Sequence, residues 1–362
     1  MNAVTTSYGV MSTNRWMIYG ANGYTGRLIA REAVGRGERP VLAGRSRGKI
    51  EPLARELGCE SRVFKLRRAQ QTASHLEGLA AVLHCAGPFS ATGVPMIEAC
   101  LAARVHYLDI TGELDVIEAA AERHGRARAA GVGLIPAVGF DVVPSDCLAA
   151  MLARRLPGAT HLELAFFGQM RLSPGTAKTM LEKLAQGGRV RKDGKITRVP
   201  FAWKVREIPF RHGAQRAMTI PWGDVATAYH TTGIPNVEVY SAMPGIDPQK
   251  IRYAEKAARL LRFWPLRALA RRAIRRRFRG PSDEERRLGR AEFWGRASDD
   301  AGRAVEATLD TPEGYRLTVA TALAATLRVL AGGAPPGFST PAAAFGEEFI
   351  LEFDGTDFEW RE

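Results

Sequence analysis

The chain has 362 residues, and 51 lysines and arginines against 38 aspartates and glutamates give it a formal net charge of +13. With 46% hydrophobic, 25% charged and 8% aromatic residues, the composition is that of a globular protein, and it excludes a disordered or low-complexity chain. The length predicts two domains. The basic excess points to an anionic partner without choosing among nucleic acid, lipid, an acidic protein and a phosphorylated small molecule.

The cysteines and the apolar runs indicate where the protein resides. Cys59, Cys85, Cys100 and Cys147 lie far apart, without the spacing of a zinc site or a redox motif, so we expect reduced thiols, no metal and a cytoplasmic protein. Residues 1–13 have no basic start followed by an apolar run, and we expect a flexible lead rather than a signal or transit peptide. The uncharged apolar run at 317–327 is far shorter than the ~20 residues that span a bilayer.

Residues 14–147 alternate short apolar runs with amphipathic stretches. In chain order the runs are WMIYG, PVLAG, RVFKL, LAAVLHCA, VHYLDI and VGLIPA. Six strands with intervening helices predict an α/β domain with a doubly wound parallel sheet, the Rossmann arrangement. The third connection, 67–78, is short and polar, and we expect it to lack a full helix.

After residue 147 the pattern changes. The alternating segments HLELAFF, KITRVPFAWKV, NVEVYSAM and RAVEATL predict antiparallel strands, interleaved with helical stretches at 174–186, 248–279 and 312–331. We assign residues 148–334 to a second, α+β domain with a mainly antiparallel sheet that closes over the first domain. For the tail, 335–362, we expect a helix from Pro341 and leave open whether it packs back on the Rossmann domain.

A glycine-rich loop follows the first predicted strand. It has GxxGxxG spacing, with glycines for the tight turn, the approach of a pyrophosphate and the packing of helix on strand. Because it lies between a first strand and a first helix, we interpret it as a dinucleotide-binding loop rather than a plain turn. Its candidate cofactor-binding residues are Gly20, Asn22, Gly23, Tyr24, Thr25 and Gly26.

The end of the second strand indicates which dinucleotide is bound. An NAD or FAD site would place Asp or Glu there for the ribose hydroxyls, whereas this chain has Arg45 and Ser46. A guanidinium group is suited to a 2′-phosphate. The sequence therefore predicts NADP(H) as the cofactor, while Arg47 and Lys49 are better explained as solvated residues beside the next helix.

Two more loops follow the fourth and fifth strands and should line the cofactor. The candidate residues are Cys85, Ala86, Gly87, Pro88 and Thr111. We interpret Cys85 as a small apolar filler, because no basic partner that would make it a thiolate is identifiable. For Thr111, a capping role toward the next helix and contact with the nicotinamide remain equal alternatives.

Several known chemistries are excluded by missing motifs. None of the eight tyrosines has the lysine four residues later that a short-chain dehydrogenase uses. HExxH, a Walker-type phosphate loop and nucleic-acid-binding motifs are also missing.

The motifs GANGYTG, LAGRS, CAGPF, HYLDITGE and GFDVVPSD occur together in this order. In order and spacing they resemble the saccharopine dehydrogenase-like NADP-binding family, closest to the branch with the trans-acting enoyl reductases and the saccharopine dehydrogenase-like oxidoreductases. The resemblance extends over nearly the whole chain, through Ser173-Pro174-Gly175-Thr176 and Gly337-Phe338-Ser339. Pro174 stands where that branch usually has glycine.

The resemblance implies hydride transfer from NADPH to a substrate held between two domains. In the enoyl reductase branch the acceptor is a 2-enoyl thioester, and in saccharopine-type members it is an imine. Asp141, Ser145 and Thr176 are the catalytic candidates, without an assured proton donor among them. Ser145 and Asp146 are also explained as an N-cap before a helix at 147–155.

A basic amphipathic segment accounts for most of the net charge. Residues 251–280 contain ten Arg and one Lys against one acid, Glu255, with apolar residues at helical intervals. The segment fits an anionic membrane surface or an acidic acyl carrier protein, and equally a core-packed helix pair with a solvated face. We expect an enoyl reductase-like enzyme, with imine reduction or non-catalytic NADPH binding at a membrane surface as alternatives. No nucleic-acid partner is expected, and a homodimer is left open.

Overall fold

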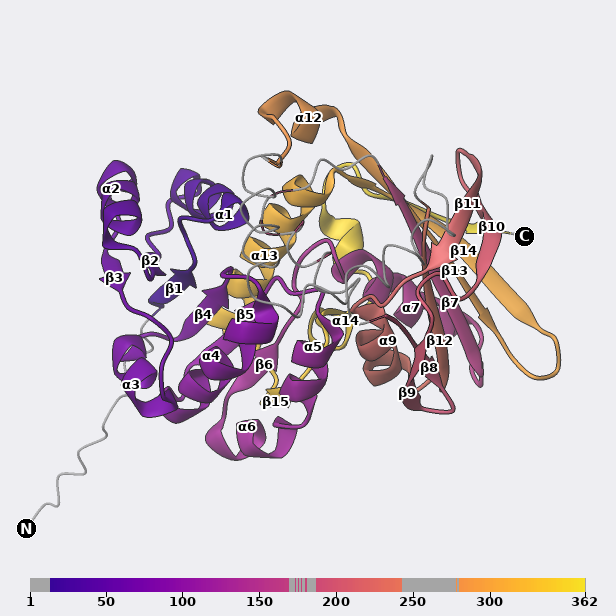
Figure 1. The fold of residues 1–362 in the computed structure, drawn as a ribbon, viewed down its shortest axis with the longest axis horizontal. Coiled ribbons are helices and arrows are strands. Elements are labelled where there is room, and N and C mark those ends of the chain that lie inside the picture. Colours follow the sequence, from indigo (N-terminus) through magenta and orange to yellow (C-terminus); the bar gives the residue numbers. More distant parts are fainter. Residues whose placement is uncertain are drawn as a thin grey trace, which may run out of the picture.

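The structure is a computed structural model that describes residues 14–168, 187–242 and 280–361, together with 173, 175, 177, 180 and 278. Two β-sheets stand face to face with helices between them, as Figure 1 shows. Almost all residues of the predicted helices at 174–186 and 248–279 lie outside the described residues. The candidate Thr176 also lies outside them. In the part that is described, no helix is long and apolar enough to cross a membrane.

The first sheet has seven parallel strands in the order β15-β6-β5-β4-β1-β2-β3. The strands are β1 (Trp16–Tyr19), β2 (Val41–Gly44), β3 (Ser61–Val63), β4 (Ala81–His84), β5 (His106–Asp109), β6 (Gly133–Ile135) and β15 (Gly337–Phe338). Strands β1, β2 and β4 are buried along their whole length, as in a parallel sheet that is covered on both faces. The predicted doubly wound sheet is confirmed, and its strand order reverses between β1 and β4.

The helices of this half connect consecutive strands. They are α1 (Tyr24–Gly35), α2 (Arg47–Leu57), α3 (Ala69–Ala73), η1 (Ser74–Leu76), α4 (Phe89–Ala103), α5 (Leu114–Ala121) and α6 (His124–Ala130). The third connection contains only the short α3 and one 3₁₀ turn, as expected from its polar sequence.

The second sheet has nine described strands. Its main path is β10-β11-β12-β7-β13-β14-β16, with β8 and β9 attached at β12. The strands are β7 (His161–Gly168), β8 (Gly188–Lys192), β9 (Lys195–Val199), β10 (Val205–Phe210), β11 (Gly213–Thr219), β12 (Asn236–Ala242), β13 (Arg290–Ser298), β14 (Ala304–Pro312) and β16 (Asp357–Arg361). All its pairs are antiparallel except β7 with β12, so the predicted mainly antiparallel sheet is confirmed.

Helices from the second half fill the space between the sheets. These helices are α7 (Val143–Arg155), α9 (Asp224–Thr232), α13 (Gly314–Leu330) and α14 (Pro341–Phe345), while α12 (Asp283–Leu288) lies at the edge and η3 (Phe349–Glu352) in the tail. Helix α7 packs on β13 and β14, and α9 contacts both α7 and α5. The two halves therefore share one buried layer.

Helix α13 and the tail return to the first sheet. Helix α13 packs against α1, β4 and β5, and β15 pairs with the edge strand β6, whereas β16 closes the second sheet beside β14. The predicted second domain, 148–334, includes α13. In the structure this helix follows β14 in the chain but covers the Rossmann sheet, so the predicted boundary does not match the packing. A sequence pattern predicts that α13 is a helix and does not show which sheet its apolar side chains cover.

Candidate functional site

The glycine loop forms where the first and fourth strands end side by side. Gly20 has a φ of +89°, and a Cβ atom there would lie 2.8 Å from the backbone nitrogen of Ala86. At Gly26 a Cβ would lie 2.5 Å from the carbonyl oxygen of Gly20. Both positions exclude a side chain, one because of the neighbouring loop and the other because α1 packs closely on β1.

The N-terminus of α1 points its N–H groups out of this loop. Gly23 is the N-cap residue, and no described side chain caps the helix. These N–H groups are therefore available to an anion such as a pyrophosphate.

The three polar residues of the loop have different surroundings. The side chain of Asn22 lies next to Gly44 at the end of β2, and Thr25 lines the cavity described below. Tyr24 instead faces the second half of the chain, where its hydroxyl donates to the Pro281 carbonyl at 2.6 Å and accepts from Arg286. The Tyr24 hydroxyl is therefore engaged with the segment at 281–286.

Arg45 stands at the rim of a basic pocket. The pocket has a volume of about 430 Å³, and two further cations, Lys65 and Arg67, line it with Arg45. All three follow the carboxyl ends of β2 and β3, where an adenosine 2′-phosphate lies in folds of this kind. Ser46 is the N-cap residue of α2, and Arg47 forms an ion pair with Glu51 at 2.6 Å, consistent with a surface role for Arg47.

The loop after β4 lines the cofactor side of the site, and Glu113 holds it in place. The Glu113 carboxylate accepts hydrogen bonds from the backbone N–H groups of Phe89 and Ser90, at 2.8 and 2.7 Å. This carboxylate therefore occupies the N-terminus of α4, so the N-terminus of α1 is left for the phosphates. Burial raises the pKa of the Cys85 thiol far above its usual range, so this residue is a neutral filler and not a nucleophile.

A buried carboxyl group, Asp109, supports the turns after β5 and β6. It accepts from the backbone N–H groups of Thr111 and Ala137, at 2.9 and 2.8 Å, and from the hydroxyl of Tyr107. Burial raises the pKa of Asp109 to about 6. The Thr111 hydroxyl in turn accepts from the N–H of Glu113, the N-cap residue of α5, so Thr111 shapes the start of this helix.

A cavity of about 120 Å³ opens beside these loops. The Rossmann side contributes Thr25, Cys85, Gly87, Phe89, Ile110, Gly112 and Glu113, and the rest of the lining is Phe140, Asp141, Ser173, Gly175, Met180, Trp222, Tyr315 and Thr318. Tyr315 packs edge to face on Tyr24 with 4.9 Å between ring centroids, which closes one side of the cavity. The cavity therefore lies next to the carboxyl ends of β1, β4 and β5, and both halves of the chain form it.

Of the three predicted catalytic residues, Asp141 lines this cavity. Its carboxyl group lies against Gly112, where a Cβ would be 2.5 Å from Asp141 Oδ2, and its carbonyl accepts from the indole N–H of Trp222 at 2.6 Å. Ser145 is buried within α7, where its hydroxyl donates to the Val142 carbonyl at 3.2 Å, and it is not part of the cavity lining. Thr176 lies outside the described residues, although Ser173 and Gly175 line the cavity.

The predicted N-cap role of Ser145 and Asp146 is wrong, because α7 begins at Val143 and both residues lie in its first turn. The Asp146 carboxylate accepts from Thr231 and from the N–H of Ala342, so it ties α7 to α9 and α14.

Comparison with known proteins finds a similar family for about a third of the chain. Residues 16–135 match the family described as the saccharopine dehydrogenase NADP binding domain. This part of the chain is similar to the NADP-binding domain of saccharopine dehydrogenases. NADP(H) is therefore the cofactor of this domain, and the cofactor prediction is confirmed.

Two relatives are similar to a little under half of the chain. A trans-acting enoyl reductase of Mycobacterium tuberculosis is 33% identical over 183 residues, and one of Mycobacterium leprae is 34% identical over 184. Each match covers 46% of this chain and 44% of the relative. The chain thus spans less than half the length of these relatives.

Solved structures share the fold of both halves. Saccharopine dehydrogenase (L-Glu forming) from Saccharomyces cerevisiae has a TM-score of 0.65 at 11% identity, covering 96% of this chain and 100% of that one. Homospermidine synthase from Legionella pneumophila, in complex with NAD, has a TM-score of 0.62 at 11% identity, covering 96% and 91%. The arrangement of an NADP-binding domain with a second, mixed-sheet domain is therefore a known fold.

Several residues of the site give no signal in the sequence. Trp222, Tyr315 and Thr318 come from segments about 200 to 300 residues beyond the glycine loop, and only the tertiary structure brings them to the cavity. Lys65 and Arg67 do have a signal that was missed, since they lie at the carboxyl end of the third predicted strand, at the same sheet edge as Arg45.

Proposed function

We propose that this protein is an NADPH-dependent oxidoreductase that reduces the carbon–carbon double bond of a 2-enoyl thioester. The observation that carries the proposal is the cavity that both halves form beside the glycine loop. The match to trans-acting enoyl reductases supports the choice of substrate.

The residues present fit the cofactor. Gly20 leaves open the space that a Cβ would fill, α1 offers uncapped N–H groups to the pyrophosphate, and Arg45 with Lys65 and Arg67 would hold the 2′-phosphate. When bound, NADPH supplies a hydride. The protein must then position the acceptor carbon about 3–3.5 Å from the hydride donor and provide a proton to the neighbouring carbon.

Asp141 is our candidate for the residue that holds this proton. Two acidic side chains, Asp141 and Glu113, line the cavity. The Glu113 carboxylate already accepts hydrogen bonds at the N-terminus of α4, so Asp141 is the better candidate. Trp222 and Gly112 fix the position of Asp141 from two sides. The aromatic lining, including Phe140, Trp222 and Tyr315, limits the access of water to the reacting atoms.

The charges of the cavity favour an acyl substrate over a dicarboxylic amino acid. Its described lining includes the acids Glu113 and Asp141 and no lysine or arginine. A substrate with two carboxylates would place its negative charges beside these acids without a compensating cation among the described residues.

Steady-state assays with purified protein would test this proposal. We expect NADPH oxidation with crotonyl-type thioesters and none with mixtures of an amino acid and a keto acid. Activity with the mixtures alone would establish imine reduction. Tight NADPH binding without oxidation by either substrate would favour a non-catalytic NADPH-binding protein.

For the basic segment 251–280, we propose a surface for an acidic acyl carrier protein that delivers the thioester. The segment lies almost wholly outside the described residues, and its support is its charge of ten Arg and one Lys against one acid. Changing Arg275, Arg276 and Arg277 to Glu should weaken carrier-protein binding in a salt-sensitive manner and leave NADPH binding unchanged. Loss of binding to anionic vesicles without an effect on the carrier protein would point to a membrane surface instead.

A further inference from the structure

Three carboxylates lie side by side on neighbouring strands of the second sheet. Glu292 of β13 is paired in register with Asp310 of β14, and Asp310 is paired with Asp357 of β16. Residues paired in register project from the same face of a sheet. Like charges in this arrangement destabilise the sheet unless cations compensate them.

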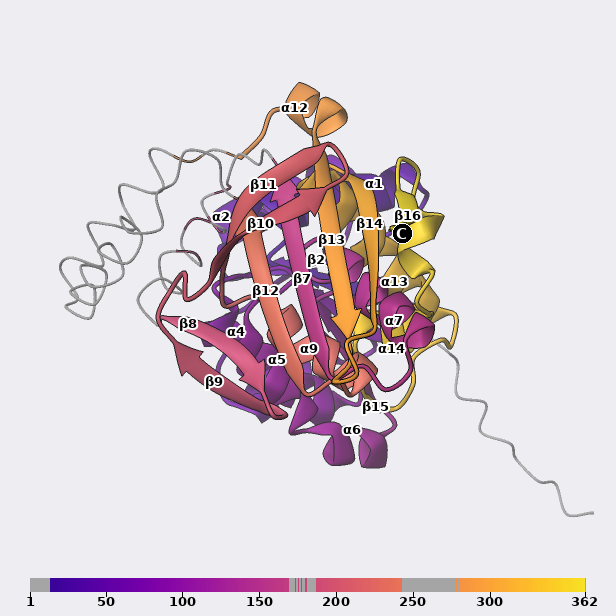
Figure 2. The same ribbon diagram turned by 90° about the vertical axis from the view of Figure 1, so that its right-hand side faces the viewer.

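This face is the one turned away from the cofactor. On β13, a Cβ atom at Gly295 would lie 2.6 Å from Leu152 of α7, so the odd-numbered residues of this strand face the interior helices. Side chains alternate along a strand, and Glu292 therefore projects to the opposite face, as does Trp294. There the β10–β11 hairpin lies over the sheet (Figure 2). Phe210 at the end of β10 belongs to one apolar cluster with Trp294.

The turn of this hairpin brings one permanent cation to the carboxylates. Arg211 forms ion pairs with Asp357 and with Glu359, and its guanidinium nitrogen lies 3.4 Å from Asp310. A single guanidinium group is thus shared among three acids. Together with Glu292, the group contains four carboxylates. Besides His212, two cations act on Asp310, namely Arg211 and Arg290. A neutral His212 would leave two negative charges unbalanced.

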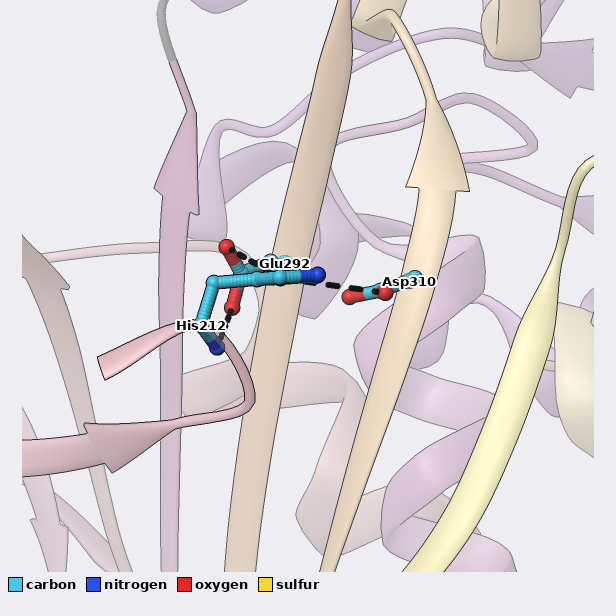
Figure 3. Close-up of side chains that lie close together, drawn as sticks. All are labelled: His212, Glu292 and Asp310. Carbon is cyan, nitrogen blue, oxygen red and sulfur yellow. Dashed lines mark hydrogen bonds and ion pairs between the residues drawn. The ribbon is translucent and has the colours of Figure 1, made fainter. Parts of the chain in front are cut away.

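His212, the next residue, reaches the two most buried acids. Its Nδ1 atom lies 3.0 Å from Glu292 Oε1 and 4.0 Å from Asp310 Oδ2, and its backbone N–H donates to Glu292 Oε2 at 3.2 Å. Figure 3 shows the carboxyl group of Asp310 directed toward the His212 ring.

Asp310 gives a second, independent indication of a missing ligand. The residue is only 7% exposed, and its Oδ1 atom has no hydrogen-bond partner among the described residues. A buried carboxylate oxygen without a partner is costly, and burial together with Glu292 raises the pKa of Asp310.

We propose that His212, Glu292 and Asp310 bind a divalent transition-metal ion of the zinc class. One imidazole nitrogen and two carboxylate oxygens form a typical donor set for such an ion, and these atoms lie within 4.8 Å of one another. Donor atoms around a tetrahedral zinc are about 3.4 Å apart. The distances of 3.0 and 4.0 Å from His212 Nδ1 lie on either side of this value, so small side-chain rotations bring the three donors to one ion.

The ion would fasten the hairpin tip to β13 and β14, with water at its remaining position. This site is independent of the proposed reduction at the cofactor. The sequence pattern did not indicate it, because the ligands are separated by 80 and 18 residues and lie on three different strands or turns.

Metal titration of the full chain tests the proposal. After treatment with a chelator, the wild-type protein should bind one Zn²⁺ per chain in calorimetry, and Co²⁺ should produce the visible absorption bands of a low-symmetry site. His212 is largely exposed, so His212→Ala should fold normally, bind NADPH as the wild type does and lose at least about 10–100-fold in Zn²⁺ affinity. His161→Ala is the matched control and should bind Zn²⁺ normally. It also removes an exposed histidine, at the start of β7, the strand that pairs with β13, and this end of β7 lies far from Glu292.

A second measurement follows the hairpin itself. Zn²⁺ should slow amide hydrogen exchange in β10 and β11 of the wild type and of His161→Ala, and have no such effect in His212→Ala or Glu292→Gln. Absence of Zn²⁺ binding by the wild type, or binding that His212→Ala and Glu292→Gln leave intact, would overturn the proposal.

Discussion

Arg45 is the residue whose chemistry separates NADPH from NADH. It lines a pocket with Lys65 and Arg67 at the end of β2 and β3, and no acid occupies the position at which NAD-dependent folds bind the ribose. We predict that Arg45→Gln weakens NADPH binding by about 10–100-fold, the effect of losing a charge-assisted hydrogen bond, and leaves NADH binding almost unchanged. Fluorescence titration with both cofactors measures this difference.

Arg47→Gln is the matched control for Arg45, because the Arg47 side chain is paired with Glu51. It should bind both cofactors as the wild type does. If Arg45→Gln and Arg47→Gln behaved alike, the 2′-phosphate would be held by other residues of the pocket.

Asp141 is the residue on which the proposed chemistry depends. We predict that Asp141→Asn lowers kcat for the enoyl thioester by about 10²–10⁴-fold, the usual contribution of a positioned proton donor, with an unchanged Kd for NADPH. Asp193→Asn, at an exposed turn between β8 and β9, is the control and should retain full activity. A kcat within a few-fold of the wild type for Asp141→Asn would assign the proton to another group, such as bound water.

At this scale the sequence predicts those residues that belong to a local motif. Gly20 and Arg45 follow recognisable strands, so their position at the sheet edge could be inferred before the structure was known. Trp222 and Tyr315 could not be inferred, because an aromatic residue that lines a cavity and one in the core have the same sequence signature.

At the scale of single elements, Asp109 joins the ends of β5 and β6 and should make stability depend on pH. Burial raises its pKa from 3.8 to about 6, so the folded state binds this proton more tightly than the unfolded state does. Its contribution to the free energy of unfolding is therefore lost as the pH rises from about 4 to about 6. The two pKa values correspond to a change on the order of 3 kcal/mol.

Asp109→Asn has no such proton, and its amide oxygen can still accept from the N–H groups of Thr111 and Ala137. We predict that the free energy of unfolding of the wild type, measured relative to this variant by urea denaturation, falls between pH 4 and pH 6.5. Parallel pH profiles for the two proteins would contradict the prediction.

Elements were predicted better than their ends. Six of the seven strands of the first sheet lie where the apolar runs indicated, because a strand buried on both faces needs a continuous apolar run. The seventh, β15 in the tail, was not predicted, since its two residues form no such run. Helix α7 was expected from residue 147 but begins at Val143, since the polar residues Ser145 and Asp146 find buried partners inside the protein instead of capping a helix end. Tertiary contacts of this kind are not visible in local sequence.

At the scale of the whole molecule, the two halves are joined by elements that cross between them. The hydroxyl of Thr318 on α13 accepts from the N–H of Phe140, and Thr321 donates to the Val138 carbonyl. Strand β14 of the second sheet leads directly into this helix, which packs on the first sheet. The sequence pattern suggested two consecutive domains, because the contacts that join them link residues more than 170 positions apart.

This shared layer predicts that the chain unfolds as one unit and that NADPH stabilises all of it. With free NADPH at about 100 times its Kd, the free energy of unfolding should rise by about 2.7 kcal/mol, and calorimetry should show one transition that moves as a whole to a higher temperature. Gly20→Ala places a methyl group against Ala86 in the cofactor loop and should abolish this shift. Two transitions, of which NADPH moves only one, would show that the halves unfold independently despite α13. Hydrogen exchange would then locate the boundary between the two units. If the halves unfold independently, the amides of β13 and β14 gain no protection from NADPH. If the chain is a single cooperative unit, they gain as much protection as the amides of β1 and β4.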